Sequence, residues 1–200
     1  MMKLDISGKE IKLKKELNDL DKLALDFTKI LDLNRVRYVL VSGYVSILFG
    51  RSRSSEDIDI IVEKISMKKF AGLWKHILRK FECINAVSMH DAYERHLMAG
   101  SAVRFARKGK FIPNIEFKFP KIDLENWVLD NRKVVALNRY RIKISPIELQ
   151  IAYKLILSTG KDIEDARHLY KLFKGMIDEG LLKYFLEKFD KEDAFNRYVE

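Results

Sequence analysis

The spacing of apolar residues changes along the chain, and each change marks a different kind of predicted element. Over residues 10–33, apolar side chains recur mostly three or four positions apart with lysines between them, which is the period of an amphipathic helix. Residues 38–41, Tyr-Val-Leu-Val, are instead types that favour β-strands. We therefore predict one helix over 10–33, followed by a first sheet strand over 38–41.

A turn, a short helix and a second strand are predicted next. Ser42 and Gly43 end the first strand, and the apolar segment 44–49 is typical of a buried helix that stops at Gly50. Serines and arginines make 51–56 a loop, after which 57–62 begins with the alternation Asp-Ile-Asp-Ile. This alternation gives the second strand one polar face and one apolar face.

The middle of the chain combines one helix with two predicted hairpins. Helical spacing over 67–80 predicts a helix that covers one face of a sheet. Residues 102–107 and 110–119 are expected to be strands joined at a Lys-Gly turn, with Pro113 placing the second strand near an edge or at a bulge. In that strand Glu116 and Lys118 share the polar face. A further hairpin is predicted over 132–137 and 140–144.

The pattern is helical throughout after Ile144. Helices are predicted at 146–158, 162–173, 179–189 and 192–198, with glycines in the breaks between them. We therefore expect an α+β fold in two parts. The first is a mixed α/β domain at 1–144, and the second is a C-terminal helical subdomain at 145–200 that packs on it.

Composition restricts the class of protein. Lys and Arg outnumber Asp and Glu by 38 to 29, a formal charge of +9 that favours polyanionic partners, although a solvated lysine-rich surface would give the same balance. No apolar run reaches the length of about 20 residues that spans a bilayer, and residues 1–15 lack the apolar core of a secretory signal. We therefore expect a cytoplasmic protein with no membrane partner. The single Cys83 is expected to be a small buried apolar residue.

Two aspartates at the start of the second strand are the first candidates for chemistry. Asp57 and Asp59 point the same way on a strand, about 6.5–7 Å apart, and would repel by about 2–3 kcal/mol unless a divalent cation joined them. The ordinary polar face of a half-exposed strand is the alternative. Upstream, Gly43 has no Cβ and lets the backbone approach a phosphate closely, and the Ser42 hydroxyl offers a further contact.

The order of these features resembles the nucleotidyltransferase signature of the DNA polymerase beta superfamily. More narrowly, it is similar to the minimal nucleotidyltransferases and the AbiEii-type toxins, in which a Gly-Gly-Tyr-Ala-like turn precedes an Arg-x-Thr-x-Asp-Ile-Asp-like strand. The corresponding residues are Ser-Gly-Tyr-Val at 42–45 and Arg-Ser-Ser-Glu-Asp-Ile-Asp at 53–59. Ser42 stands where the first glycine is usual, and Ser55 stands where threonine is common.

The resemblance implies a set of ligands and a third carboxylate. Asp57 and Asp59 would hold Mg²⁺ or Mn²⁺, and a nucleoside triphosphate would be the co-substrate. The third carboxylate is expected on a later strand, where Glu116 is the candidate, with Asp91 and Asp123 as rivals and a plain surface role for Glu116 as the alternative.

The resemblance extends into the helical tail and the basic loop. Lys154 would supply positive charge to the triphosphate, and Asp162 would orient that lysine or replace Glu116 as the catalytic carboxylate. The alternatives are an exposed helix lysine and an aspartate that caps its helix. Arg51 and Arg53 could contact the triphosphate or an acceptor polynucleotide, or they could belong to a solvated loop.

The function expected from these residues is transfer of a nucleoside monophosphate from a nucleoside triphosphate such as ATP. The acceptor would be a hydroxyl of RNA, including tRNA, or of a protein, and the protein would be the toxin of a toxin–antitoxin pair. The alternative is a non-catalytic module that binds nucleotide or RNA. Other chemistries fail on spacing, because the sequence has no Walker motif, no Gly-x-Ser-x-Gly elbow and no zinc-site spacing of its histidines.

Overall fold

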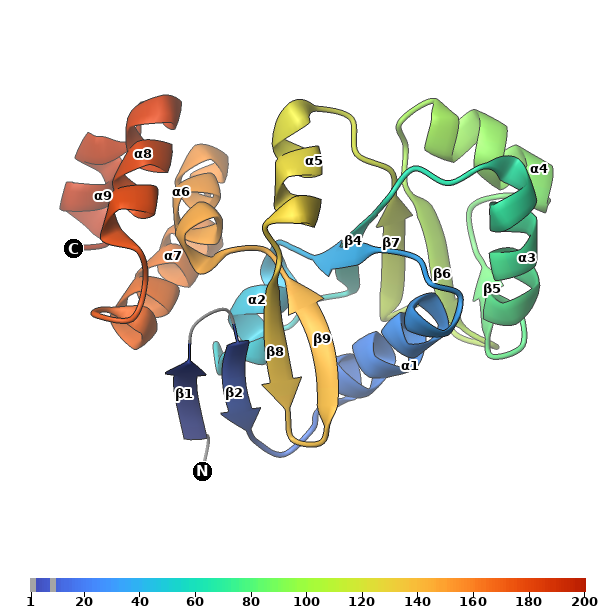
Figure 1. Ribbon diagram of the computed structural model, residues 1–200, viewed down its shortest axis with the longest axis horizontal. Coiled ribbons are helices and arrows are strands. Elements are labelled where there is room, and N and C mark those ends of the chain that lie inside the picture. The colour runs from blue at the N-terminus through green and yellow to red at the C-terminus, as the bar shows by residue number, and fades with distance from the viewer. Residues whose placement is uncertain (1–2, 8–9) are drawn as a thin grey trace.

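A mixed β-sheet forms the centre of the protein, as the computed structural model in Figure 1 shows for residues 3–7 and 10–200. Its strands are β1 (Lys3–Ser7), β2 (Glu10–Lys14), β3 (Tyr38–Leu40), β4 (Asp57–Val62), β5 (Phe81–Cys83), β6 (Val103–Arg107), β7 (Asn114–Lys118), β8 (Lys133–Leu137) and β9 (Tyr140–Ile144). Within the described residues they form one sheet in the order β1-β2-β8-β9-β3-β4-β7-β6-β5.

Helices flank this sheet. They are α1 (Asp19–Leu33), α2 (Gly43–Leu48), α3 (Met67–Ile77), α4 (Met89–Asp91), a π-helical segment η1 (Ala92–Met98), α5 (Asp123–Asp130), α6 (Ile147–Leu157), α7 (Gly160–Phe173), α8 (Glu179–Phe189) and α9 (Glu192–Tyr198). The last four gather at one side of the sheet, and α5 stands between them and α3 (Figure 1). The predicted α+β class, with a mixed sheet flanked by helices, is confirmed. None of the helices in the described ranges is both long enough and apolar enough to traverse a bilayer.

One face of the central strands is covered by helices, and the other carries polar side chains. Ile60 of β4 and Phe117 of β7 are register partners on adjacent parallel strands, and both are fully buried. The rings of Phe27 from α1 and Phe70 from α3 pack on Phe117 at centroid distances of 6.4 and 6.1 Å. Because side chains alternate along a strand, the covered face leaves Asp59 and its neighbours on the opposite face.

The single helix predicted over 10–33 is wrong in its first part. Glu10–Lys14 is the strand β2, which pairs with β1 and β8, and helix α1 begins only at Asp19. Ile11 and Leu13 are buried while the residues between and around them are not, which is the period of a strand. Asn18 then caps α1 by accepting a hydrogen bond of 2.8 Å from the Asp21 N–H.

The placement of the second strand in the 102–119 hairpin is also corrected. β7 lies inside the sheet between β4 and β6, not at an edge, and no residue of the strand is proline, because Pro113 precedes its first residue. The missing N–H of Pro113 therefore does not interrupt the hydrogen-bonded ladder. The elements β1, β5, α4, η1 and α5 were not predicted from the sequence. Cys83 lies in β5 and is half-buried, and burial raises the pKa of its thiol.

Candidate active site

A strained turn joins β3 to α2 at the centre of the candidate site. Ser42 has φ 63° and ψ −139°, a backbone conformation that side chains with a Cβ rarely adopt. Such a residue costs about 1–3 kcal/mol unless the surroundings hold it in place. The motif that the sequence resembles usually has glycine at this position, the residue type that adopts such a conformation without strain.

Gly43 allows another side chain to approach this turn closely. A Cβ at Gly43 would overlap the guanidinium group of Arg53. Arg53 in turn donates from Nε to Asp165 Oδ1 at 3.1 Å and from Nη2 to Asp165 Oδ2 at 2.9 Å. Because Asp165 belongs to α7, Arg53 joins the turn to the C-terminal helices.

Asp57 and Asp59 project from β4 beside this turn, as their alternation predicts. Burial raises the pKa of Asp59 to about 6, with smaller contributions from the nearby Glu116 and Asp57. Lys118 and a hydrogen bond from the Ser42 hydroxyl act in the opposite direction. The Ser55 hydroxyl donates to Asp57 at 3.4 Å. Asp59 is therefore a carboxylate held where its charge is costly, which favours binding of a cation.

Glu116 lies next to the two aspartates. It is the register partner of Asp59 on the parallel strand β7, so the two side chains share one face of the sheet. The Glu116 carboxylate forms an ion pair of 2.5 Å with Arg104, its register partner on β6. The rival carboxylates lie on other elements, since Asp91 is in α4, where it accepts from the Val87 N–H, and Asp123 opens α5.

The predicted residues of the helical tail form a buried ion network. Lys154 Nζ lies 2.7 Å from Asp162 Oδ1 and 2.9 Å from Asp165 Oδ2, and all three side chains are at most 5% exposed. Burial alone would raise the pKa of Asp162, but hydrogen bonds from Lys154 and Thr159 outweigh it and lower the pKa below its ordinary value. Arg51 pairs with Glu164 on the same helix.

The alternative roles considered for Lys154 and Asp162, a surface lysine and a helix cap, are both wrong. Lys154 is 2% exposed, so it is not a surface lysine. Asp162 does not cap α7, because the cap is Thr159, whose side chain accepts from the Asp162 N–H. The Asp162 carboxylate is engaged with Lys154. Arg51, Arg53, Lys154 and Asp162 are thus brought together by one helix, α7.

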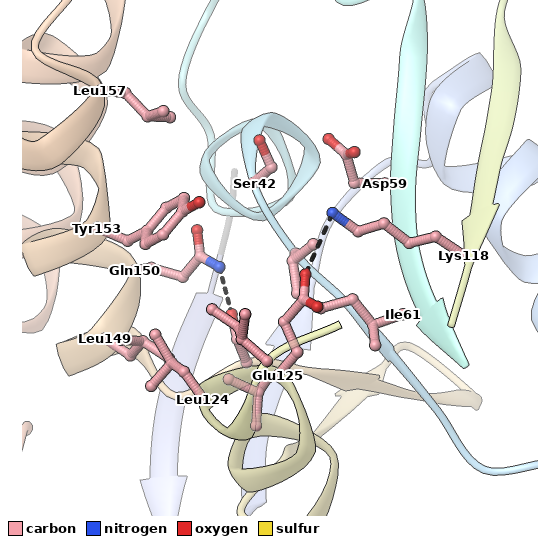
Figure 2. A pocket seen from close by; sticks show the side chains of 14 residues that line it. Ser42, Asp59, Ile61, Lys118, Leu124, Glu125, Leu149, Gln150, Tyr153 and Leu157 are labelled. Carbon is pink, nitrogen blue, oxygen red and sulfur yellow. Dashed lines mark hydrogen bonds and ion pairs between the residues drawn. The ribbon is translucent and has the colours of Figure 1, made fainter. Parts of the chain in front are cut away.

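A pocket of about 250 Å³ opens beside Asp59, between the sheet and helices α5 and α6 (Figure 2). Ser42, Asp59 and Lys118 form its polar end. The walls are largely apolar and include Ile122, Leu124, Glu125 and Val128 from α5 and the loop before it, and Leu149, Gln150, Tyr153 and Leu157 from α6. In the described part of the chain, Lys154, Asp162, Arg51 and Arg53 are not among its lining residues.

Several residues that line this pocket were not predicted from the sequence, for different reasons. Lys118 follows Glu116 by two positions, and their shared face was predicted, so the signal for Lys118 was present in the alternation of β7. Glu125 could not be found because α5 was not predicted. Gln150 and Tyr153 lie on α6 three positions apart, a spacing that marks one helix face but not what that face contacts.

The carboxylates fit a divalent cation that arrives with a nucleotide. No trio of histidine, cysteine, aspartate or glutamate in residues 3–7 and 10–200 forms a complete metal site by itself. Mg²⁺ is usually held by one or two carboxylates together with substrate phosphates, not by a cage of protein ligands. Asp57 and Asp59, on one face of β4 beside the Ser42 turn, match that donor set, and Mn²⁺ accepts the same ligands.

Comparison with solved structures identifies the architecture. An antigenic nucleotidyltransferase-like protein from Paracoccidioides brasiliensis superposes with a TM-score of 0.54 at 17% sequence identity, over 90% of this chain and 92% of that one. The chain has a nucleotidyltransferase fold. A CCA-adding enzyme in complex with ATP is similar with a TM-score of 0.37 at 17% identity, over 84% of this chain and 43% of that one. No known family model and no curated protein matches the sequence.

Proposed function

We propose that this protein is a metal-dependent nucleotidyltransferase, which transfers a nucleoside monophosphate from a nucleoside triphosphate to an acceptor hydroxyl. The observation that carries the proposal is the convergence of Asp57, Asp59 and Glu116 on one open sheet face beside the Ser42 turn. Three carboxylates from two adjacent strands, next to a nucleoside-sized pocket, provide sites for a metal ion and for a base.

The reaction assigns a separate task to each part of the site. The acceptor oxygen bonds to the α-phosphorus as the bond from that phosphorus to the β-phosphate oxygen breaks, and pyrophosphate leaves with the electron pair. A bound Mg²⁺ or Mn²⁺, held by Asp57 and Asp59, would neutralise charge on the phosphates. Glu116 accepts the proton of the attacking hydroxyl, and Arg104 orients this carboxylate before the acceptor binds.

The pocket beside Asp59 accommodates the nucleoside. Its polar end, at Ser42, lies next to the carboxylates, and its apolar walls suit a sugar and a base. Tyr153, which is 42% exposed, offers a ring on which a base can stack. The nucleoside therefore lies between the sheet and α6, with its phosphates toward the turn.

The basic residues of the loop and tail hold this arrangement in place. Arg53 positions the turn through Asp165, and Lys154 and Asp162 keep α6 and α7 in contact. Arg51 lies at the outer end of this network, near Glu164, where a polynucleotide can reach it. Arg53, Lys154 and Asp162 thus act on the nucleotide through the position of the turn and helices.

We further propose that the acceptor is RNA and that the protein is an AbiEii-like toxin. The charge of +9 supports a polyanionic acceptor such as tRNA, and the motif resemblance supports a toxin neutralised by a partner protein. Expression of the chain in a bacterial host should stop growth, and Asp59→Asn should restore it. Equal growth with both proteins would contradict the toxin role.

The direct test is transfer of label from each α-³²P-labelled nucleoside triphosphate in the presence of Mg²⁺ or Mn²⁺, total RNA and cell extract. The wild type should label RNA or protein, and Asp57→Asn, Asp59→Asn and Glu116→Gln should each lower the rate at least about 100-fold. Asp123→Asn, an exposed carboxylate on α5, is the matched control and should retain full activity.

A non-catalytic nucleotide-binding module is the second candidate. It is favoured by Ser42 at a glycine position and by the ion pair that occupies Glu116. Binding of a triphosphate with no transfer to any acceptor would support this candidate over the enzyme.

A further inference from the structure

Lys118 is a cationic side chain that faces the candidate site from the sheet. It follows Glu116 by two positions on β7 and therefore lies on the same face as the carboxylates. Figure 2 shows its ammonium group between Asp59 and Glu125, with Nζ 3.6 Å from Glu125 Oε1. Among the described residues that line the pocket, it is the one with a positively charged side chain.

The other cations near the site already have close acidic partners. Lys154 lies within 3 Å of both Asp162 and Asp165 and is almost fully buried. Arg53 makes two hydrogen bonds to Asp165, and Arg104 pairs with Glu116 at 2.5 Å. Lys154 and Arg53 are at most 15% exposed and cannot leave their partners without exposing an unpaired buried charge. Arg104 is half exposed but is held by its short pair with Glu116.

Lys118 is held differently. Its distance of 3.6 Å to Glu125 is longer than a hydrogen bond, and 27% of its side chain is exposed. The four-carbon stem of lysine lets the ammonium group move by several ångströms at little cost. Lys118 can therefore exchange its carboxylate neighbours for a new anion that enters the pocket.

We propose that Lys118 binds the phosphates of the incoming nucleotide, and that before the nucleotide arrives its ammonium group neutralises the site at Asp59. This inference rests on the proposed function, since it assigns the phosphate-binding cation of the same site. Glu125 holds the resting position of the lysine from α5. On binding of a triphosphate with its metal, Lys118 would leave Asp59 free to hold the metal and would turn its ammonium group to the phosphate oxygens.

The proposal predicts opposite effects of one substitution on two ligands. Removing the charge in Lys118→Met should tighten Mn²⁺ binding in the absence of nucleotide by about tenfold, because a competing cation has left Asp59. The same change should weaken binding of a non-hydrolysable α,β-methylene triphosphate by about 10–100-fold, because a charge-assisted contact is lost. A residue that served only the structure would not move the two affinities in opposite directions.

The experiment measures Mn²⁺ binding by electron paramagnetic resonance and analogue binding by calorimetry on the full chain. Lys118→Arg should keep both affinities near the wild type, and Lys121→Met, at an exposed lysine in the following loop, is the matched control. Glu125→Gln should strengthen analogue binding when Lys118 is present and have no effect in the Lys118→Met background. Thermal unfolding of each variant checks that it is folded.

The outcomes separate this inference from the proposed function. If the wild type binds Mn²⁺ and the analogue, and Lys118→Met matches Lys121→Met for both, the role of Lys118 is overturned while the nucleotide site stands. If the wild type binds neither ligand, the proposed function and the role of Lys118 fall together. Opposite shifts of the two affinities in Lys118→Met support the proposal.

Discussion

Asp59 and Glu116 lie directly opposite each other on the parallel strands β4 and β7, with their side chains on one face of the sheet. Each has a cationic neighbour, since Lys118 lies close to Asp59 and Arg104 pairs with Glu116. The resting site therefore carries its own counter-charges. Bringing these carboxylates together nevertheless costs free energy, and that cost can be measured.

The first prediction concerns stability and pH in Asp59→Asn. Burial raises the pKa of Asp59 from the ordinary 3.8 to about 6, so the folded state holds this proton more tightly than the unfolded state. Well below pH 3.8 the carboxyl is protonated in both states and costs nothing. Between pH 3.8 and pH 6 the unfolded state ionises first, so above pH 6 the folded protein has lost up to about 3 kcal/mol, at about 1.4 kcal/mol per pKa unit.

Asp59→Asn should therefore raise the free energy of unfolding by about 2 kcal/mol at pH 8 and by no more than about 0.5 kcal/mol at pH 4. Urea unfolding at both pH values measures the difference. Asp123→Asn, at an exposed position, should show no such gain at either pH. A stabilisation that is the same at pH 4 and pH 8 would mean that burial of the Asp59 charge is not its cause.

The second prediction concerns metal binding. A divalent cation binds the ionised carboxylate, so protonation of Asp59 near pH 6 competes with the metal. The apparent Mn²⁺ affinity should be level above pH 7 and should fall by about tenfold per pH unit well below pH 6. Calorimetric titration from pH 5 to pH 8 tests this profile. A profile that stays flat down to pH 5 would remove Asp59 from the metal site.

The third prediction separates backbone strain from the hydroxyl group at Ser42. Ser42→Gly relieves the positive φ of 63°, whereas Ser42→Ala keeps the Cβ and the strain. The glycine variant should be more stable than the alanine variant by about 1 kcal/mol in thermal or urea unfolding. Both variants lose the hydrogen bond that lowers the pKa of Asp59, so both should move the midpoint of Mn²⁺ binding to higher pH. Equal stability of the two variants would mean that the turn is not strained.

Alternation and turn chemistry predicted the centre of the site because those signals are local. The Asp-Ile-Asp-Ile pattern placed both aspartates on one face, and the same period placed Glu116 with Lys118 on another strand. Strand β2 was not predicted because Glu10–Lys14 is short and its apolar residues continue into the helical spacing of α1. The spacing of apolar residues alone does not show where the strand ends and the helix begins.

The pairing of the basic residues could not be predicted in the same way. Arg53 and Asp165 are 112 positions apart, and no sequence pattern around either residue indicates that the other is its partner. The sequence could bring Lys154 and Arg53 into one candidate site through the resemblance, but their common partner follows only from the packing of α7 against α2 and α6. The wall of the pocket formed by α5 was missed for a related reason, because that helix was not predicted.

The last prediction tests whether Arg53 and Asp165 position the glycine turn. Asp165→Asn removes a fully buried charge that faces Arg53 and Lys154, and should lower the free energy of unfolding by about 3–5 kcal/mol. Glu164→Gln is the matched control on the same helix. Its carboxylate is 55% exposed, so losing the pair with Arg51 should cost less than about 1 kcal/mol.

Gly43→Ala supplies the second half of this test. An added Cβ would push the Arg53 guanidinium away from Asp165, so the substitution should destabilise the wild type by about 1–3 kcal/mol. In the Asp165→Asn background Arg53 is already released, and the same substitution should cost clearly less. A double-mutant cycle by urea unfolding measures this coupling. If the losses in the free energy of unfolding simply add, Gly43 and Asp165 are not energetically coupled through Arg53, and the turn is held by its own backbone.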